Sequence, residues 1–227
     1  MEKWKNVNIL YEDNHLLVVV KPANMPVCLD ESNDIDLLTI LKSYLKEKYQ
    51  KPGNVYLGLV HRLDRPVSGV MVFAKTSKAA ERLTNQIKNH QFNKTYYAIV
   101  MGSGSIKEKD TLTDYLIKNN SNNNSYITTK DKGKLSTLSY EVISKKDNLL
   151  LIKIHLETGR HHQIRVQFSS RNAPLYGDHR YNPKFINDNK EDIALIAKTL
   201  SFYHPITKEL LTFDIPLPKK YPWTIFS

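Results

Sequence analysis

The residues most suited to chemistry lie in one short stretch, HRLDRPVSGV, at residues 61–70. Its single carboxylate, Asp64, stands between Arg62 and Arg65, and a proline, a serine and a glycine follow as turn-forming residues. The apolar segments YLGLV before it and VMVFAK after it predict two strands joined by this loop. A carboxylate on a turn held by a rigid sheet is a common arrangement at catalytic sites. These residues leave one alternative open, a solvated surface turn whose exposed ion pair contributes only ~0–1 kcal/mol.

Arginine is concentrated in two windows, whereas lysine is spread along the whole chain. There are seven arginines against 26 lysines, and the first window holds Arg62 and Arg65. The second window, LETGRHHQIRVQFSSRNAPLYGDHRY at residues 156–181, holds four more: Arg160, Arg165, Arg171 and Arg180. A guanidinium group holds carboxylates and phosphates in a fixed geometry, which a lysine ammonium does not. We therefore expect the two windows to meet in the fold.

The segments around these windows predict an α+β fold. NILYE and HLLVVVK, separated by the turn residues Asp13 and Asn14, predict an N-terminal hairpin. Apolar periodicity predicts helices over residues 34–49 and 78–92. The expected N-caps are Asp34 or Asp36 for the first helix and Ser77 for the second. Further strands are expected over residues 93–102, 111–118, 125–130, 135–145 and 148–157.

Within the second window, the segment QIRVQFSS fits either a helix or a strand by its periodicity. Thr158-Gly159 before it and Asn172 with Pro174 after it favour a helix of two to three turns. Exposed backbone N–H groups at the start of this helix would be suited to bind a phosphate. A charged amphipathic helix on the surface is the alternative.

Composition is that of a globular protein with a basic balance. The chain has 227 residues, 41% of them hydrophobic, and a formal net charge of +10. We find no linker or repeat, so we expect one domain over residues 1–227. The charge suggests a polyanionic partner, although lysine-rich solvated faces also produce it.

The lone Cys28 excludes an internal disulfide and fits a reducing compartment. No segment approaches the ~18 apolar residues of a membrane span, so we expect a cytoplasmic protein.

Taken together, HRLDRPVSGV, NKTYYAIVMG and LETGRHHQIRVQF resemble the RluA-type RNA pseudouridine synthases. The opening EDNHLLVVVKPANMPV and the closing AKTLSFYHPITKELLTFDIPLP resemble the ends of that catalytic domain, so the likeness spans nearly the whole chain. Departures from the usual pattern, which bear on substrate fit, occur at Asn24, Val67, Val70, Gln167 and Asn182.

The resemblance implies a fold. It points to a mixed, mostly antiparallel sheet with flanking helices and a central catalytic cleft. It also implies a catalytic domain alone, without the N-terminal RNA-binding domain that some relatives carry.

The resemblance implies an isomerase that needs neither a cofactor nor a metal. Such enzymes break the bond between ribose and uracil in RNA and rejoin the base through carbon. By match to HRLD, the nucleophile is Asp64, and by match to QIR, Arg165 is the cation that keeps it ionised. By match to KTY, Tyr96 would stack on the base or help remove its carbon-bound proton.

The same resemblance assigns RNA contacts. A uridine in folded RNA must be flipped out of its stack before it can react. Ile164 would pack on the flipped base, and Arg62 would hold a phosphate or fill the vacated space. Arg160, His161 and His162 would contact the RNA backbone. Relatives act on ribosomal RNA, transfer RNA or both. The asparagine-rich tip at 119–124 and the stretch 182–192 are candidates for that choice, and we expect a monomer.

Two other classes of function remain as alternatives. A non-catalytic RNA-binding relative is disfavoured because Asp64, Tyr96 and Arg165 are all present. A metal-dependent hydrolase is disfavoured because arginines in the same windows would repel a divalent ion and no HExxH-like spacing occurs. Its ligands would come from His61, Asp64, His161, His162, Asp178 and His179.

Overall fold

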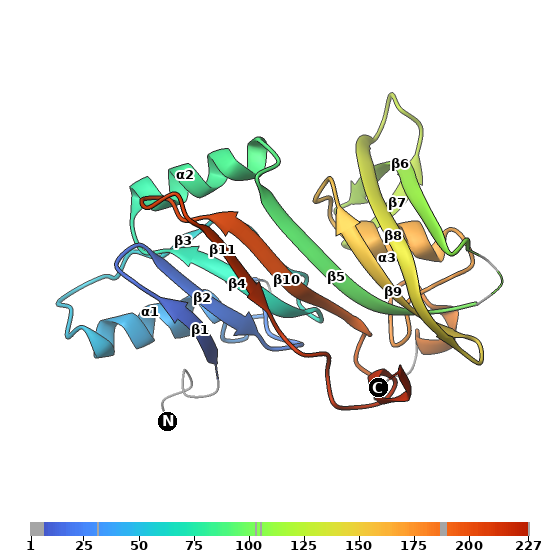
Figure 1. Ribbon diagram of the computed structural model, residues 1–227, viewed down its shortest axis with the longest axis horizontal. Helices are drawn as coiled ribbons and strands as arrows, with labels where there is room; N and C mark the ends of the chain where they lie inside the picture. Colours follow the sequence, from blue (N-terminus) through green and yellow to red (C-terminus); the bar gives the residue numbers. More distant parts are fainter. Residues whose placement is uncertain (1–6, 31, 103, 105, 187–189, 227) are drawn as a thin grey trace. The chain divides into compact units, whose positions relative to one another are not determined.

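The computed structural model forms two compact units (Figure 1). The chain passes from one unit to the other within the strands β5 (Phe92–Met101) and β10 (Leu195–Tyr203), and a third time between Ile215 and Pro216. Unit 1 comprises Met1–Asn93 and Ala197–Ile215, and unit 2 comprises Lys94–Ile196 and Pro216–Ser227. The structure describes residues 7–30, 32–102, 104, 106–186 and 190–226.

Unit 1 is built on a sheet whose central strands are β2 and β4. The predicted N-terminal hairpin is confirmed, and β2 also pairs antiparallel with β4, where Leu16 faces Ala74 and Lys21 faces Gly69. Strand β10 lies on the other side of β4 and pairs with β11, while the short β3 also pairs with β4. The strand bounds are β1 Asn8–Glu12, β2 Leu16–Lys21, β3 Gly58–Leu59, β4 Ser68–Ala74 and β11 Leu210–Asp214.

The strands β2 and β4 run through the core of unit 1. Residues 16–19 of β2 and 71–74 of β4 have no exposed surface. Burial on both faces explains why these segments are continuous apolar runs instead of alternating polar and apolar residues.

Two helices flank this sheet (Figure 1). Helix α1 (Leu37–Lys48) begins after Asp36, whose side chain accepts a hydrogen bond from the Thr39 N–H at 2.9 Å, as expected. Helix α2 spans Ser77–Lys88.

Both expected ends of α2 were wrong. Its N-cap is Thr76, because Thr76 has an extended backbone and accepts a hydrogen bond from the Ala79 N–H. Ser77 is already the first helical residue. At the other end, His90 adopts a left-handed backbone conformation with φ 55°, which stops the helix before residue 92.

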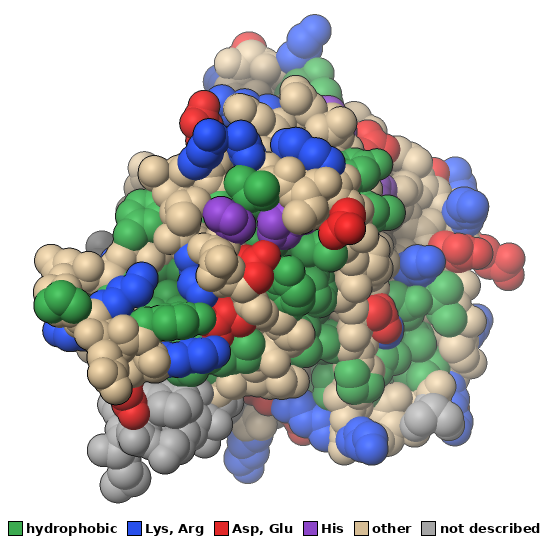
Figure 2. Space-filling view, turned by 60° about the vertical axis from the view of Figure 1, so that its left-hand side comes forward, with side chains coloured by type: hydrophobic (Ala, Val, Ile, Leu, Met, Phe, Trp, Pro, Cys, Tyr) green, Lys and Arg blue, Asp and Glu red, His purple; other side chains and the backbone are tan. Residues whose placement is uncertain are grey.

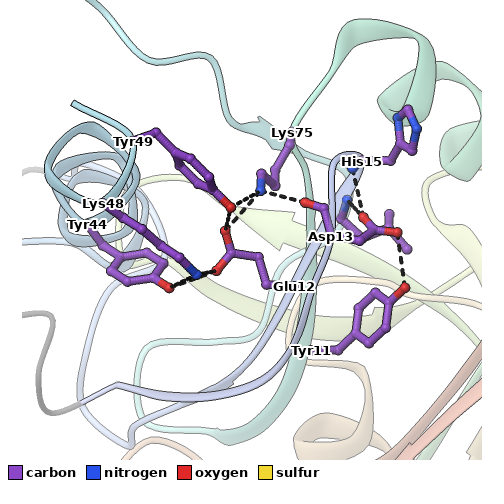
Figure 3. A network of polar contacts seen from close by, with 9 residues as sticks. Tyr11, Glu12, Asp13, His15, Tyr44, Lys48, Tyr49 and Lys75 are labelled. Carbon is purple, nitrogen blue, oxygen red and sulfur yellow. Dashed lines mark hydrogen bonds and ion pairs between the residues drawn. The ribbon is translucent and has the colours of Figure 1, made fainter. Parts of the chain in front are cut away.

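A polar cluster ties the first hairpin to α1 and to the end of β4 (Figure 3). Glu12 accepts hydrogen bonds from Tyr44 Oη, Lys48 Nζ and Tyr49 Oη at 2.7 Å each, and from Lys75 Nζ at 2.9 Å. We call these five residues the Glu12 cluster. Burial alone would raise the pKa of Glu12, but the hydrogen bonds from Lys48, Lys75 and the two tyrosines outweigh burial and hold the pKa at about 2.

Unit 2 is an antiparallel meander with one helix packed on it. The strand order is β5-β9-β8-β6-β7, and every neighbouring pair is antiparallel. The predicted strands of this meander are confirmed, as is the preference for a helix in the segment QIRVQFSS. Phe168 of the helix packs edge-on against Tyr140 of β8, with ring centroids 5.1 Å apart. The bounds are β6 Lys109–Asn119, β7 Asn124–Thr128, β8 Lys134–Lys146, β9 Leu149–Leu156 and α3 Gln163–Ser169.

Both units therefore combine strands and helices, and the predicted α+β class with a mostly antiparallel sheet is confirmed. Among the described residues, no helix combines the length and the apolar character needed to cross a membrane.

Candidate active site

Asp64 lies in unit 1, half-buried, on the loop that leads into β4. Its carbonyl accepts a hydrogen bond from the Val67 N–H at 3.0 Å, which closes the turn. The His61 ring fixes the start of the loop, because its Nε2 accepts a hydrogen bond from the Val72 N–H of β4 at 3.1 Å. Leu63, 8% exposed, and Val67, 2% exposed, anchor the loop in the core on both sides of the carboxylate. The backbone that carries Asp64 is therefore rigidly held.

A buried lysine holds the same loop from behind. Lys21 has no exposed surface, and its Nζ donates hydrogen bonds to the carbonyls of Arg65 at 2.9 Å, Pro22 at 2.7 Å and Met25 at 2.8 Å. Burial lowers the pKa of Lys21 to about 7, whereas the charge of Asp64 opposes that shift. Sequence reasoning missed this residue. Its only signal was a lysine that ends the apolar strand LLVVVK directly before a proline.

The two arginines beside Asp64 differ in their surroundings. Arg62 is exposed. Arg65 donates a hydrogen bond to Ser32 Oγ at 2.8 Å and forms ion pairs with Asp34 and Asp30. The ion pairs of Arg65 thus hold the segment before α1.

Gly69, in the SG part of the motif, is required by its position. Its φ of +140° is one that other residues rarely adopt, and a Cβ atom there would lie 2.4 Å from the carbonyl oxygen of Ala197 in β10. Only a glycine lets β4 begin this close to β10.

In unit 2, the TGRHHQIR segment folds around the side chain of Gln163. Its Oε1 accepts hydrogen bonds from Thr158 Oγ1 at 2.9 Å and from the Arg160 N–H at 3.0 Å, and its Nε2 donates to the Thr137 carbonyl at 3.1 Å. This glutamine therefore shapes the turn between β9 and α3. Arg160 is exposed, and its Nε donates to the Leu135 carbonyl at 3.0 Å.

The two adjacent histidines stack on each other, with ring centroids 3.7 Å apart. His161 is half-buried, and its Nδ1 lies 2.9 Å from Ser125 Oγ in β7. His162 is only 7% exposed, with a left-handed φ of 53°. Burial, together with the positive charge of Arg165, lowers the pKa of His162 to about 2, so this ring is neutral near pH 7. The ring of His162 at the start of α3 is therefore buried, whereas Arg160 just before it is exposed, and a phosphate site at this helix start stays a prediction.

Arg165 is buried and held by Asp178. Its Nε donates to Asp178 Oδ2 at 2.8 Å and its Nη2 to Asp178 Oδ1 at 2.7 Å. The exposed fractions of the two side chains are 3% and 0%. The ring of Tyr181 lies against the guanidinium, 5.1 Å from its carbon atom to the ring centroid. From sequence, Asp178 was considered only as a possible metal ligand, and nothing in the sequence indicated its partner.

Tyr96 and Ile164 are both buried side chains of unit 2. Tyr96 lies in β5 opposite Ile154 of β9 and is 6% exposed, whereas its neighbour Tyr97 is half-buried. Ile164, in the first turn of α3, is 5% exposed. Of the candidate site residues, Arg62 and Asp64 therefore lie in unit 1, and Tyr96, Arg160, His161, His162, Ile164 and Arg165 lie in unit 2.

The asparagine-rich tip forms the turn between β6 and β7. Arg180 Nη1 donates to the Asn122 carbonyl at 3.0 Å and to Asn124 Oδ1 at 2.9 Å. An arginine of the second window thus holds the tip. In the other segment considered for substrate choice, residues 187–189 lie outside the described part of the chain.

The excess of basic side chains does not form a single patch on the face shown in Figure 2. Lysine and arginine side chains are interspersed there with acidic and hydrophobic ones. Among the described residues, no three His, Cys, Asp or Glu side chains are grouped so that they could hold a metal ion.

Comparison with known proteins agrees with these motifs. A family model described as RNA pseudouridylate synthase matches residues 15–170. An uncharacterised RNA pseudouridine synthase of Bacillus subtilis is 34% identical over 216 residues, which cover 94% of this chain and 70% of that protein. The ribosomal large subunit pseudouridine synthase D of Zymomonas mobilis is 35% identical over 227 residues, with coverage of 94% and 70%.

A solved structure shares the fold. Human RNA pseudouridylate synthase domain containing 4 has a TM-score of 0.76 at 22% identity, covering 93% of this chain and 89% of that one. The chain belongs to the RNA pseudouridylate synthase family, whose members are isomerases that act on RNA, as the resemblance of its motifs predicted.

Proposed function

We propose that this protein isomerises uridine in ribosomal or transfer RNA to pseudouridine, with Asp64 as the nucleophile. The observation that carries the proposal is the carboxylate of the HRLD motif, half-buried on a loop that Lys21 and His61 hold in place. A nucleophile gains from such a rigid support because the reacting atom must be placed accurately before the reaction starts.

Arg165 is the proposed cation that keeps Asp64 ionised, and Tyr96 the proposed aromatic group for the target base. Both assignments come from the QIR and KTY matches. The fixed orientation of Arg165 on Asp178 supports the first, since a held guanidinium can direct its N–H groups at an anion. The proposal requires these side chains and Asp64 to act on one nucleotide.

The remaining candidates are proposed RNA contacts. Arg62 and Arg160 are exposed and permanently charged, so they suit the RNA backbone. His161 would join them, whereas His162 is neutral and would support its neighbour by stacking. Ile164 would pack on the flipped base.

Ribosomal RNA is the first substrate to test, because the name of the Zymomonas mobilis relative refers to the large ribosomal subunit. Transfer RNA is the second. The cytoplasmic location and the monomeric state stay predictions.

The test replaces the proposed nucleophile by an isosteric amide. We expect Asp64→Asn to lower the single-turnover rate of pseudouridine formation by at least ~10³-fold on both RNA classes, because an amide cannot act as the nucleophile. RNA binding, measured by filter retention, should stay close to that of the natural chain.

The matched control is Asp131→Asn, which makes the same change at an exposed turn residue between β7 and β8. It should leave the rate unchanged. Wild-type activity in Asp64→Asn would contradict the assignment, and lost binding in the same variant would point to a role in RNA affinity.

A further inference from the structure

We infer that Arg65 is a further RNA contact, which exchanges two carboxylates of its own chain, Asp30 and Asp34, for a phosphate group of the substrate. We call these two carboxylates the acidic pair. The inference rests on the proposed function, in which RNA reacts at Asp64. It gives a ligand to an arginine to which the motif matches assigned no role.

The backbone of Arg65 is fixed beside the proposed nucleophile. Its carbonyl accepts a hydrogen bond from the Nζ of the buried Lys21 at 2.9 Å. Consecutive Cα atoms lie only ~3.8 Å apart. A nucleotide that reacts with Asp64 therefore brings its own phosphate groups within reach of a long arginine side chain at position 65.

The side chain of Arg65, unlike its backbone, is accessible to water, with an exposed fraction of 42%. Its Nη1 donates to Ser32 Oγ at 2.8 Å and lies 3.8 Å from Asp30 Oδ2. Its Nη2 forms a hydrogen-bonded ion pair with Asp34. The side chains of the acidic pair are themselves 43% and 53% exposed. Ion pairs with such access to water are weak, so an incoming anion can replace them at little cost.

The acidic pair occupies the place that a phosphate would take. The hydrogen bond from Arg65 holds the pKa of Asp34 below its ordinary value, and hydrogen bonds from Ser32 do the same for Asp30. Both carboxylates are therefore ionised near pH 7. A guanidinium fork binds carboxylate and phosphate oxygens in the same way. Because two negative charges already face one positive charge, a phosphate must displace a carboxylate to reach Arg65.

The acidic pair is held in position without help from Arg65. The Ser32 N–H donates to Asp30 Oδ1 at 3.0 Å, and the Asp34 N–H donates to Ser32 Oγ at 3.2 Å. The Asn33 N–H donates to the Asp30 carbonyl at 3.3 Å. These bonds stay in place when the guanidinium leaves, so the exchange requires a movement of the Arg65 side chain only.

The exchange favours RNA that enters the catalytic loop. A free arginine attracts any polyanion through its long-range field, whereas a neutralised arginine contributes only when a phosphate makes direct contact. RNA that lies elsewhere on the basic surface leaves the acidic pair on Arg65 and gains nothing from this residue. The acidic pair thus weakens unproductive binding more than productive binding.

The test varies the protein concentration in single-turnover assays, on whichever of the two RNA classes the wild-type protein isomerises. The half-saturating concentration reports RNA affinity, and the plateau rate reports the chemical step. We expect Asp30→Asn/Asp34→Asn to lower the half-saturating concentration about 2–5-fold, because weak exposed ion pairs no longer compete. Arg65→Gln should raise it about 3–10-fold and affect it more than the plateau, since a phosphate contact is lost.

Two comparisons separate this exchange from a general effect of charge. In an Arg65→Gln background, Asp30→Asn/Asp34→Asn should cause no tightening, because the residue for which these carboxylates compete is gone. The matched control is Asp131→Asn/Asp147→Asn, which removes two carboxylates from exposed turns of unit 2 and changes the net charge equally. It should leave the half-saturating concentration unchanged.

Three results would overturn the inference. Equal tightening in the control or in the Arg65→Gln background would show that net charge is the cause. Weaker or unchanged binding in Asp30→Asn/Asp34→Asn would show that the acidic pair only holds the loop. An unchanged half-saturating concentration in Arg65→Gln would show that this residue does not contact RNA.

Arg65→Lys covers the case in which Arg65→Gln does not fold, which circular dichroism detects. It keeps the positive charge and should stay within about threefold of the wild-type half-saturating concentration. A loss of binding in a folded Arg65→Lys protein as large as in Arg65→Ala would contradict a charge contact. If the wild-type protein isomerises neither RNA class, or if Asp64→Asn keeps its activity, the proposed function itself fails. Those outcomes do not involve Arg65, so the two failures are distinguishable.

Discussion

Two carboxylates of this protein each accept four hydrogen bonds, yet their surroundings indicate opposite roles. Glu12 of unit 1 is bonded by four side chains that come from α1, the residue after it and the residue after β4. Asp178 of unit 2 is bonded by one guanidinium and two backbone N–H groups. Glu12 joins several elements to each other, whereas Asp178 joins one side chain to one turn. The two carboxylates therefore differ in which elements supply their hydrogen-bond donors, although the number of hydrogen bonds is the same.

The two carboxylates also differ in how far water can reach their hydrogen-bond partners. Lys48, a partner of Glu12, has a side chain that is 45% exposed, so water can replace part of that contact. Arg165 and Asp178 are 3% and 0% exposed. We therefore expect unequal costs when each carboxylate is removed.

The largest effect on stability should follow loss of the buried carboxylate. Asp178→Ala leaves Arg165 charged and without this partner in a buried site, which costs about 3–5 kcal/mol of unfolding free energy. Urea unfolding measures it. The double variant Asp178→Ala/Arg165→Met removes both charges and should be more stable than Asp178→Ala alone. If the double variant is the less stable of the two, desolvation of Arg165 is not the cause.

A smaller, pH-dependent effect is expected at Glu12. Its pKa of about 2 in the folded protein lies below the ~4.3 of an unfolded chain, so its ionised form stabilises the fold above that pH. The contribution is lost as the pH falls toward 2. Glu12→Gln should therefore cost about 1–3 kcal/mol at pH 7 and clearly less at pH 3.

Urea unfolding at both pH values measures this difference. The matched control is Glu157→Gln. Glu157 is exposed, and no ion pair is seen for it among the described residues, so this variant should change the free energy of unfolding little at either pH. An equal cost of Glu12→Gln at pH 7 and pH 3 would show that shape, not charge, explains the effect.

The smallest effect should come from one partner of Glu12. Tyr49→Phe removes a single hydroxyl from a side chain that is 44% exposed, so we expect a loss of about 0.5–1 kcal/mol. In a Glu12→Gln background the loss should shrink, because the two groups interact directly. Full additivity would mean that the hydroxyl stabilises the fold through Lys75, to which it lies 3.2 Å, and not through Glu12.

Local sequence patterns predicted most of the elements. The apolar runs predicted β2 and β4 because such runs reflect burial. The turn residues on both sides of α3 predicted that helix because they mark its ends within a short segment. The N-cap of α2 was assigned to Ser77 instead of Thr76, since both residue types suit that position and the backbone angle decides.

The candidate site was only partly predictable. Asp64 could be proposed from the sequence because its motif is contiguous. Lys21 was not found, because its three carbonyl acceptors become visible only when the loops fold over it. Asp178 was considered only as a metal ligand, because its partner Arg165 lies 13 residues away on another element and their contact appears only in the fold. His162 was expected to contact the RNA backbone, and the burial of its ring could not be predicted from the sequence.

The phenol of Tyr181 has one further consequence. Its oxygen accepts a hydrogen bond from the Ser125 N–H at 2.7 Å and lies 2.8 Å from His162 Nδ1. A phenol can both donate and accept, so this one oxygen serves both contacts and connects the β6–β7 hairpin to α3. With a pKa of about 2, His162 does not change its charge within the physiological pH range, so titration of the ring does not disturb this connection there.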